Sequence, residues 1–349
     1  MRDSLKSQHV ESGQIGISVV ICCFNSGWVL KRTLEAIAVQ KVDDCVPWEI
    51  IVVDNNSTDN TQSTILDFKR SNPHLDANIV IEKAQGLSHA RIAGYKQAKY
   101  NIIIYCDDDN ILAADYLQIA IDFMLANPHV GQCGGIGEPI FEGDPDPRIL
   151  PFIDIYATGP QGSTGIFDIT DRGFANGAGM VTRKSVLDHI FKCGFEYTST
   201  GRSGKTLSGG EDVELGYAIK VAGYSIYYNE NLKYQHVLAK HRLNWEYLKK
   251  MVYGSGNSNV FFHPDTIYTI QSHPLYILLH YYFRTIKRIP RIFLGSPTPA
   301  EQLKFSYFCG ALRGINREFW NVCNLRKKAR IMYKSLNDSR DDHKGSLVS

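Results

Sequence analysis

Short apolar runs alternate with segments of helical periodicity over the first 130 residues. The runs are rich in β-branched side chains, which predicts strands that are buried on both faces. Between the runs, apolar residues recur every three or four positions, which predicts helices. The expected strands are 17–24, 49–54, 77–82 and 101–106, and the last two expected helices are 88–99 and 113–125.

This alternation is typical of a parallel sheet covered by helices, so we predict an α/β fold with a mostly parallel sheet. After residue 130, glycine-rich turns and short apolar pieces dominate, up to residue 183. A helix is expected at 211–222 and a strand at 224–228, and the chain has helical periodicity after residue 243. The expected regions are a tail at 1–15, an α/β domain at 16–240 with halves 16–130 and 131–240, a helical extension at 241–324 and a disordered tail at 325–349.

The composition is that of an ordinary globular protein, with 349 residues, 44% of them hydrophobic and 21% charged. A net charge of +2 provides no global field for nucleic acid, so we expect no nucleic-acid partner. The eight cysteines are scattered and form no CxxC pair, which favours reduced thiols in the cytoplasm. No signal peptide is apparent, and no apolar stretch reaches the ~18 to 20 residues that span a bilayer.

Three carboxylates, Asp107, Asp108 and Asp109, directly follow the expected strand 101–106. Ligands of parallel sheets bind at the carboxyl ends of the strands. Adjacent like charges repel, and Mg²⁺ or Mn²⁺ would remove that repulsion. In extended chain, Asp107 and Asp109 would point to one side and Asp108 to the other. The alternative is a solvated acidic turn that caps the next helix.

A second pair of acids, Glu211 and Asp212, opens the expected helix 211–222. A helix N-terminus stabilises an anion by about 0.3 to 1 kcal/mol, which favours an ionised carboxylate. Such a group can accept a proton from an attacking hydroxyl. Ordinary helix capping is the alternative.

Five motifs follow one another in order: VVICCFNSGWVLKRTLEAI, EIIVVDNNSTDNT, GLSHARIAGYKQA, IIIYCDDDN and GGEDVELGYAIKVAGY. With these motifs, residues 17 to about 240 resemble a family 2 glycosyltransferase of the GT-A fold, a Rossmann-like sheet flanked by helices. The resemblance implies a nucleotide-sugar-binding half at 16–130 and an acceptor-binding half at 131–240. It also implies direct displacement with inversion at the sugar carbon.

The resemblance assigns roles to the two acidic sites. Asp107 and Asp109 would hold Mn²⁺ or Mg²⁺, Asp108 would face the nucleotide, and Asp212 would be the catalytic base. His236 is a further candidate metal ligand, with a purely structural histidine as the alternative.

The remaining site residues fall into two groups. Phe24 could equally belong to the core, and Arg91 would either neutralise phosphate or pair with an acid. Asn55 stands where many relatives carry aspartate, so uracil, thymine and guanine all stay open as the base. The donor-binding residues are expected to be Phe24, Asn25, Asp54, Asn55, Arg91 and Asp108, and the acceptor or donor-sugar side is expected to hold Asn176, Gly177 and Glu211.

The implied activity is metal-dependent transfer of a sugar from a UDP-, dTDP- or GDP-linked donor to a hydroxyl of a glycan or lipid-linked acceptor, in surface polysaccharide or glycan assembly. One alternative is a sugar-phosphate nucleotidyltransferase, but CCFNSGWV lacks the glycine-rich basic loop expected of one. The other is a non-enzymatic α/β phospho-acceptor domain, against which the second acidic site argues.

The segment 274–294 mixes aromatic and aliphatic residues with Arg284, Lys287, Arg288 and Arg291. This mixture suits a helix that lies on an anionic membrane surface, which would make the enzyme peripheral on the inner face of the plasma membrane. The alternative is a helix packed on the catalytic domain with its basic side in solvent.

Overall fold

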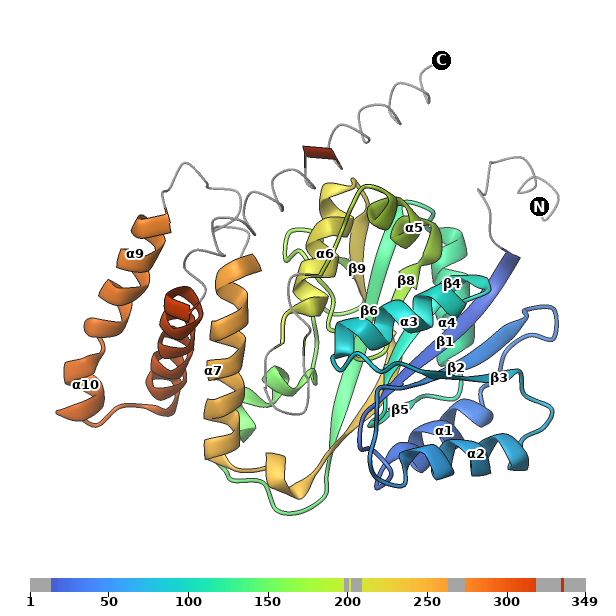
Figure 1. Ribbon diagram of the computed structural model, residues 1–349, viewed down its shortest axis with the longest axis horizontal. Helices are drawn as coiled ribbons and strands as arrows, with labels where there is room; N and C mark the ends of the chain where they lie inside the picture. Colours follow the sequence, from blue (N-terminus) through green and yellow to red (C-terminus); the bar gives the residue numbers. More distant parts are fainter. Residues whose placement is uncertain (1–13, 198–200, 202–208, 263–273, 318–333, 336–349) are drawn as a thin grey trace.

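The computed structural model describes residues 14–197, 201, 209–262, 274–317 and 334–335. In this part of the chain, a central sheet is flanked by helices on both faces and extended by further helices at the C-terminal end (Figure 1). The predicted fold class is therefore confirmed. The predicted tails at 1–15 and 325–349 lie almost entirely outside the described residues.

The amino-terminal half follows the predicted alternation closely. The strand β5, which comes directly after the three aspartates, is the one element of this half that the sequence pattern did not reveal. The elements are β1 Gln14–Cys23, α1 Leu30–Ala38, β2 Trp48–Asp54, α2 Thr61–Ser71, β3 Ala77–Ile81, α3 Leu87–Gln97, β4 Tyr100–Asp107, β5 Asn110–Leu112 and α4 Tyr116–Ala126.

The second half is more regular than the sequence pattern predicts. The glycine-rich stretch at 131–183 contains a long strand, and the strand expected at 224–228 runs on to Leu238. The elements are β6 Val130–Phe141, η1 Leu150–Tyr156, β7 Ile166–Asp168, β8 Met180–Arg183, α5 Lys184–Lys192, α6 Glu211–Val221, β9 Ser225–Leu238 and η2 Lys240–Arg242.

The glycines of β6 are required by close contacts rather than by turns. A β-carbon at Gly135 would lie 2.0 Å from the carbonyl oxygen of Leu232, and one at Gly137 would lie 2.7 Å from that of Ala157. Glycine inside a strand often marks such an approach of another backbone. The prediction of turns was wrong here because the same residue type serves both purposes.

The sheet has the strand order β3-β2-β1-β4-β8-β6-β9-β5, with β7 paired to β9. The first four strands are parallel, but β8 runs antiparallel between β4 and β6. The sheet is therefore parallel over β3, β2, β1 and β4, as predicted, and mixed over the remaining strands. Helices α1, α2 and α4 pack on one face, and α3, α5 and α6 pack on the other (Figure 1).

The register of the strands brings distant residues to one edge of the sheet. Cys23 at the end of β1 pairs with Asp54 at the end of β2, and Cys22 pairs with Asp107 at the end of β4. The short antiparallel pairing of β5 with β9 places His236 opposite Asn110. The ends of β1, β2, β4 and β9 therefore border the same region.

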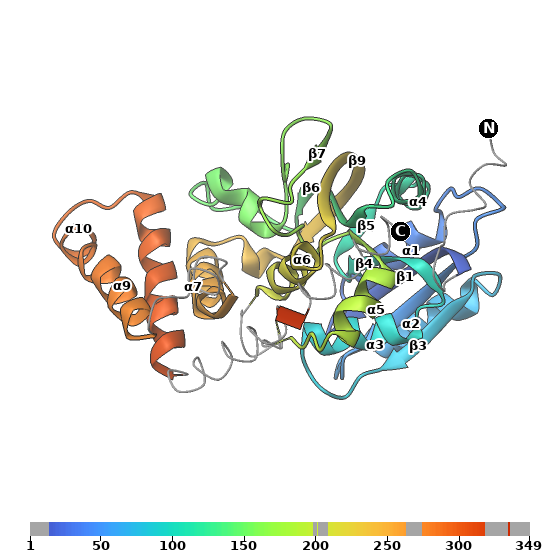
Figure 2. The ribbon, with the colours of Figure 1, turned by 90° about the horizontal axis from the view of Figure 1, so that it is seen from above.

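The C-terminal helices form a stack that leads away from the sheet. The elements are α7 Trp245–Phe262, α9 Pro274–Ile286, α10 Ile289–Phe293 and a helix at 299–317. α7 joins the domain through a core that includes Tyr156, Leu238 and Leu248. α9 packs on the helix 299–317, so α9 and α10 are the outermost elements in both views (Figures 1 and 2).

The helix 299–317 crosses α7 with the two backbones in close approach. A β-carbon at Gly310 would lie 2.0 Å from the carbonyl oxygen of Tyr253, and one at Gly256 would lie 2.1 Å from that of Tyr307. Small residues allow this crossing, which fixes the outer helices to the domain. No described helix is both long and apolar enough to cross a bilayer.

Candidate active site

A cavity of about 670 Å³ opens at the carboxyl ends of the parallel strands. Asp54 is the one predicted site residue that does not line it. The predicted residues that do line it are Phe24, Asn25, Asn55, Arg91, Asp107, Asp108, Asp109, Asn176, Gly177, Glu211, Asp212 and His236.

The three aspartates occupy a tight turn and not an extended segment. Asp107 ends β4, and Asp108 and Asp109 form the turn into β5. The Asn110 side-chain oxygen accepts the Asp107 N–H at 3.3 Å, and its amide donates to Asp109 Oδ1 at 3.3 Å. Thr33 Oγ1 donates to the Asp108 carbonyl at 2.8 Å. The expected alternation of side chains along extended chain is therefore wrong.

Arg91 lies buried between two of the acids. Its Nη2 is 3.7 Å from Asp107 Oδ1 and its Nη1 is 3.9 Å from Glu211 Oε1. Nη2 also donates to the Gly177 carbonyl at 3.5 Å. Burial alone would lower the pKa of Arg91, but the Glu211 and Asp107 carboxylates raise it above its ordinary value. Of the two roles considered for Arg91, the structure shows the pairing with acids.

Asp109 is held by His236 near the end of β9 and by Arg242 in η2. Its Oδ2 accepts a hydrogen bond from Arg242 Nη1 at 3.0 Å and lies 3.2 Å from His236 Nε2. The other ring nitrogen of His236 is 2.7 Å from the Tyr156 carbonyl, which fixes the orientation of the ring. Arg242 was not predicted, because a lone arginine has no local signature in the sequence and Asp109 lies far away along the chain.

Asp108 is the least compensated of the three. Its Oδ2 accepts the Phe24 N–H at 3.2 Å. Burial, reinforced by the neighbouring Asp109 and Asp107 carboxylates, raises the pKa of Asp108 to about 8. The two guanidinium groups nearby therefore do not remove all of the repulsion within the turn.

The cavity as a whole is acidic. Six carboxyl groups and three guanidinium groups line its wall, so even with Asp108 protonated the anions outnumber the guanidinium groups and a diphosphate would meet net repulsion there. The carboxylates are Asp107, Asp108, Asp109, Asp154, Glu211 and Asp212, and the guanidinium groups are Arg91, Arg172 and Arg242.

The donor set fits a divalent cation that arrives with phosphate. Within the described ranges, no three His, Cys, Asp or Glu side chains converge as a complete metal cage. Mg²⁺ commonly uses only one or two carboxylates together with substrate phosphates. Asp107 and Asp109 supply that number of carboxylates on one turn, and His236 lies beside Asp109.

Asp212 lies in the first turn of α6 and on the cavity wall. Its Oδ2 accepts the Gly177 N–H at 3.2 Å, and its Oδ1 accepts the Val213 N–H at 2.9 Å. A β-carbon at Gly177 would lie 2.4 Å from Arg91 Nη2, so a larger residue here would displace the guanidinium group. Gly177 thereby allows the two acidic sites to share one wall.

The turn after β2 has a structural role that the sequence did not reveal. Asn55 donates both amide protons, to the carbonyls of Glu82 at 3.0 Å and Ala84 at 2.8 Å. Its side-chain oxygen accepts the Gly86 N–H at 2.7 Å, so Asn55 orders the loop before α3. Asp54 Oδ1 accepts the Ser57 N–H at 3.0 Å. Both amide protons of Asn55 are therefore used in hydrogen bonds within the chain, so they do not indicate which nucleotide base would bind.

A second unpredicted arginine lies on the wall near Asn176. Arg172 donates from Nη2 to Asn176 Oδ1 and from Nη1 to Gln161 Oε1, both at 2.9 Å. Its guanidinium group lies 4.3 Å from the centre of the Phe174 ring. Asn176 is therefore fixed by Arg172, and no motif in the sequence pointed to that arginine.

Comparison with known families identifies this arrangement. The family model described as glycosyl transferase family 2 matches residues 18–191, about half of the chain. The chain belongs to glycosyltransferase family 2. It is therefore an enzyme that transfers sugars, and both the nucleotidyltransferase and the non-enzymatic alternative fall away.

Two curated relatives match about a third of this glycosyltransferase. A poly-β-1,6-N-acetyl-D-glucosamine synthase of Staphylococcus epidermidis is 29% identical over 131 residues, 38% of this chain and 30% of the relative. The UDP-Glc:α-D-GlcNAc-diphosphoundecaprenol β-1,3-glucosyltransferase WfgD of Escherichia coli is 30% identical over 111 residues, 32% of this chain and 42% of the relative. The match therefore spans less than half of either relative.

Two solved structures share the fold at low sequence identity. A mannosyltransferase from Pyrobaculum calidifontis, in complex with GDP-Man and Mn²⁺, aligns with a TM-score of 0.53 at 14% identity, over 93% of this chain and 84% of that one. GalNAc-T7 with UDP, GalNAc and Mn²⁺ aligns with a TM-score of 0.52 at 15% identity, over 89% of this chain and 57% of that one. These alignments support the GT-A fold.

Replacing Arg91 tests the buried ion pairs. Arg91→Met leaves the Asp107 and Glu211 carboxylates without their shared cation, so the free energy of unfolding should fall by about 3 to 5 kcal/mol. Adding Glu211→Gln should recover part of the loss. Chemical denaturation measures both effects.

Arg32→Met is the matched control, because the Arg32–Glu142 pair is about 40% exposed on each side. It should change stability by no more than about 1 kcal/mol. An Arg91→Met protein as stable as the control would contradict the account of Arg91.

Proposed function

We propose that this glycosyltransferase is metal-dependent and inverting, and that it moves a sugar from a nucleotide-diphosphate donor to a hydroxyl acceptor. The observation that carries the proposal is the acidic cavity at the strand ends, whose carboxylates outnumber its guanidinium groups. An anionic diphosphate fits such a cavity only when a cation accompanies it.

The donor would bind across the ends of β1 and β4. Asp107 and Asp109, with His236 as a further ligand, would hold Mn²⁺ or Mg²⁺ against the phosphates, and the cation would neutralise charge on the departing diphosphate. Phe24, Asn25 and Asp108 would contact the nucleotide. The mannosyltransferase crystallised with GDP-Man and Mn²⁺ and GalNAc-T7 crystallised with UDP and Mn²⁺ support a UDP-, dTDP- or GDP-linked donor.

The acceptor would bind on the side of α6. Asp212 would take the proton of the attacking hydroxyl, since its carboxylate is fixed at the cavity wall by the Gly177 N–H. Glu211 would position the acceptor together with Asn176 and Gly177. Arg91 would act indirectly, by holding the Asp107 and Glu211 carboxylates in place.

The acceptor class follows from the relatives more than from the cavity. One relative is named as a polysaccharide synthase, and the other is named for a diphosphoundecaprenol substrate. These names support a hydroxyl-bearing glycan or a lipid-linked acceptor in surface polysaccharide or glycan assembly. With a lipid-linked acceptor, the enzyme would work in the cytoplasm at the inner face of the plasma membrane.

Removing the proposed base should stop transfer but leave the donor bound. Asp212→Asn keeps an oxygen that can accept the Gly177 N–H but cannot take a proton, so kcat should fall by about 10² to 10⁴. Nucleoside diphosphate release with acceptor present measures the rate, and calorimetry measures donor affinity. Asp171→Asn, which changes a fully exposed acid, is the control and should keep the kcat and the donor affinity of the wild type. A near-normal kcat for Asp212→Asn would show that Asp212 is not the catalytic base.

The stereochemistry of the product tests the single-displacement mechanism. One base opposite one leaving group gives attack from the far face of the sugar, so the new bond should have the opposite anomeric configuration to the donor. Proton NMR of the product anomeric signal measures this directly. A product with the configuration of the donor would require a different mechanism.

A further inference from the structure

The outermost helices carry an exposed apolar stripe. On α9, Leu279, Tyr282, Phe283 and Ile286 recur at helical spacing. Ile289 and Phe293 of α10 and Leu294 directly after it are also exposed, although the Phe293 ring lies 6.1 Å from the Phe305 ring of the helix 299–317. Phe283, Phe293 and Leu294 are 69%, 70% and 88% exposed. Soluble surfaces rarely expose large apolar residues in such a contiguous group.

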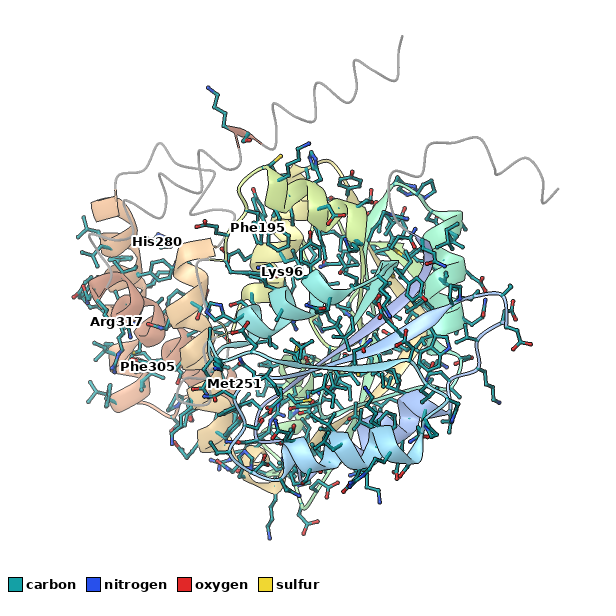
Figure 3. All side chains as sticks on the ribbon, turned by 45° about the vertical axis from the view of Figure 1, so that its right-hand side comes forward. Lys96, Phe195, Met251, His280, Phe305 and Arg317 are labelled. Carbon is teal, nitrogen blue, oxygen red and sulfur yellow. The ribbon has the colours of Figure 1, made fainter. Side chains whose placement is uncertain are left out.

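The opposite side of α9 is the side that packs. Tyr281 and Thr285 are buried, and the Tyr281 ring lies 6.0 Å from the Phe308 ring of the helix 299–317. Figure 3 labels His280 on α9 and Phe305 on that neighbouring helix, at the same outer end of the molecule. The core of the extension is therefore already filled from the inner side of α9, and the apolar stripe faces outward.

Basic side chains lie on the same two helices, and three of them reach the neighbouring helix 299–317. Arg288 and Arg284 lie 4.4 and 5.9 Å from the centre of the Phe308 ring, Arg291 pairs with Glu301 at 2.7 Å, and Lys287 is exposed. Residues 274–317 hold seven Lys and Arg and a single acid, Glu301, a net charge of +6 in a chain whose total is +2. The remainder of the chain therefore has a net charge of −4.

We propose that the α9–α10 face, defined by Leu279, Phe283, Ile286, Phe293 and Leu294 with the basic residues beside them, docks on an anionic lipid bilayer. Apolar side chains enter the boundary between headgroups and acyl chains while Lys and Arg attract anionic headgroups. The outward stripe beside a net charge of +6 matches both requirements. The negative remainder of the chain is repelled by the same surface, which orients the molecule.

This inference does not depend on the transferase site. The inner side of α9 packs on the helix 299–317, which in turn packs on α7, so the stripe is separated from the catalytic sheet by two helices (Figure 2). A change on the stripe should therefore leave transfer to a water-soluble acceptor intact.

Vesicle flotation of the full-length protein tests the docking surface. Wild-type protein should float with vesicles of phosphatidylcholine containing about one third phosphatidylglycerol, at least about tenfold more than with phosphatidylcholine alone. Phe283→Glu/Phe293→Glu should lose at least about tenfold of that binding, because two exposed apolar groups become anions on the docking face. Circular dichroism confirms that the variant folds.

Leu66→Glu/Leu125→Glu is the matched control, since both residues are exposed and lie on α2 and α4. It should float like the wild type. Equal flotation of Phe283→Glu/Phe293→Glu and wild type, or no flotation of wild type, would overturn the proposal. Light scattering that shows a wild-type oligomer dispersed by the same variant, without vesicle binding, would identify the face as a protein interface and would also overturn it.

Discussion

An acidic cavity that accepts a diphosphate must also accept a cation, and most features of this site follow from that constraint. Asp107 and Asp109 are partly neutralised by Arg91 and Arg242, yet Asp108 between them still has a pKa raised to about 8. The arginines keep the turn folded without cancelling its charge. This arrangement tolerates carboxylates at the strand ends while leaving them attractive to a metal ion.

The sheet holds this concentration of charge in place because the backbone pairing of its strands fixes the positions of the acids. Asp107 is placed by the pairing of β1 with β4, His236 by the pairing of β5 with β9, and Asp212 by the start of α6. Gly177 leaves room for the Arg91 guanidinium group, which pairs with Asp107 on one side and Glu211 on the other. The site is thus held by elements that are far apart in the sequence.

The sequence predicted the elements that have a simple hydrophobic period. The parallel strands, the position of the three aspartates after β4 and the acids at the start of α6 were all predicted from local patterns, but the turn at the aspartates was not. β6 was missed, since its glycines serve backbone contacts that only the fold reveals. Arg172 and Arg242 were missed for a different reason: a lone arginine has no local signature, and its partners lie far away along the chain. The sequence left open whether Arg91 pairs with an acid, and the structure shows that ion pair together with a second one between Arg242 and Asp109.

The central claim is that nucleotide binding at this cavity depends on a divalent cation held by the aspartate turn. Isothermal titration of UDP and GDP into metal-stripped protein, with either Mn²⁺ or a chelator present, tests it most directly. We expect at least one nucleotide to bind about tenfold or more tightly with Mn²⁺, and we expect Asp109→Asn to abolish that difference. Equal affinity with Mn²⁺ and with chelator in the wild-type protein would contradict the claim.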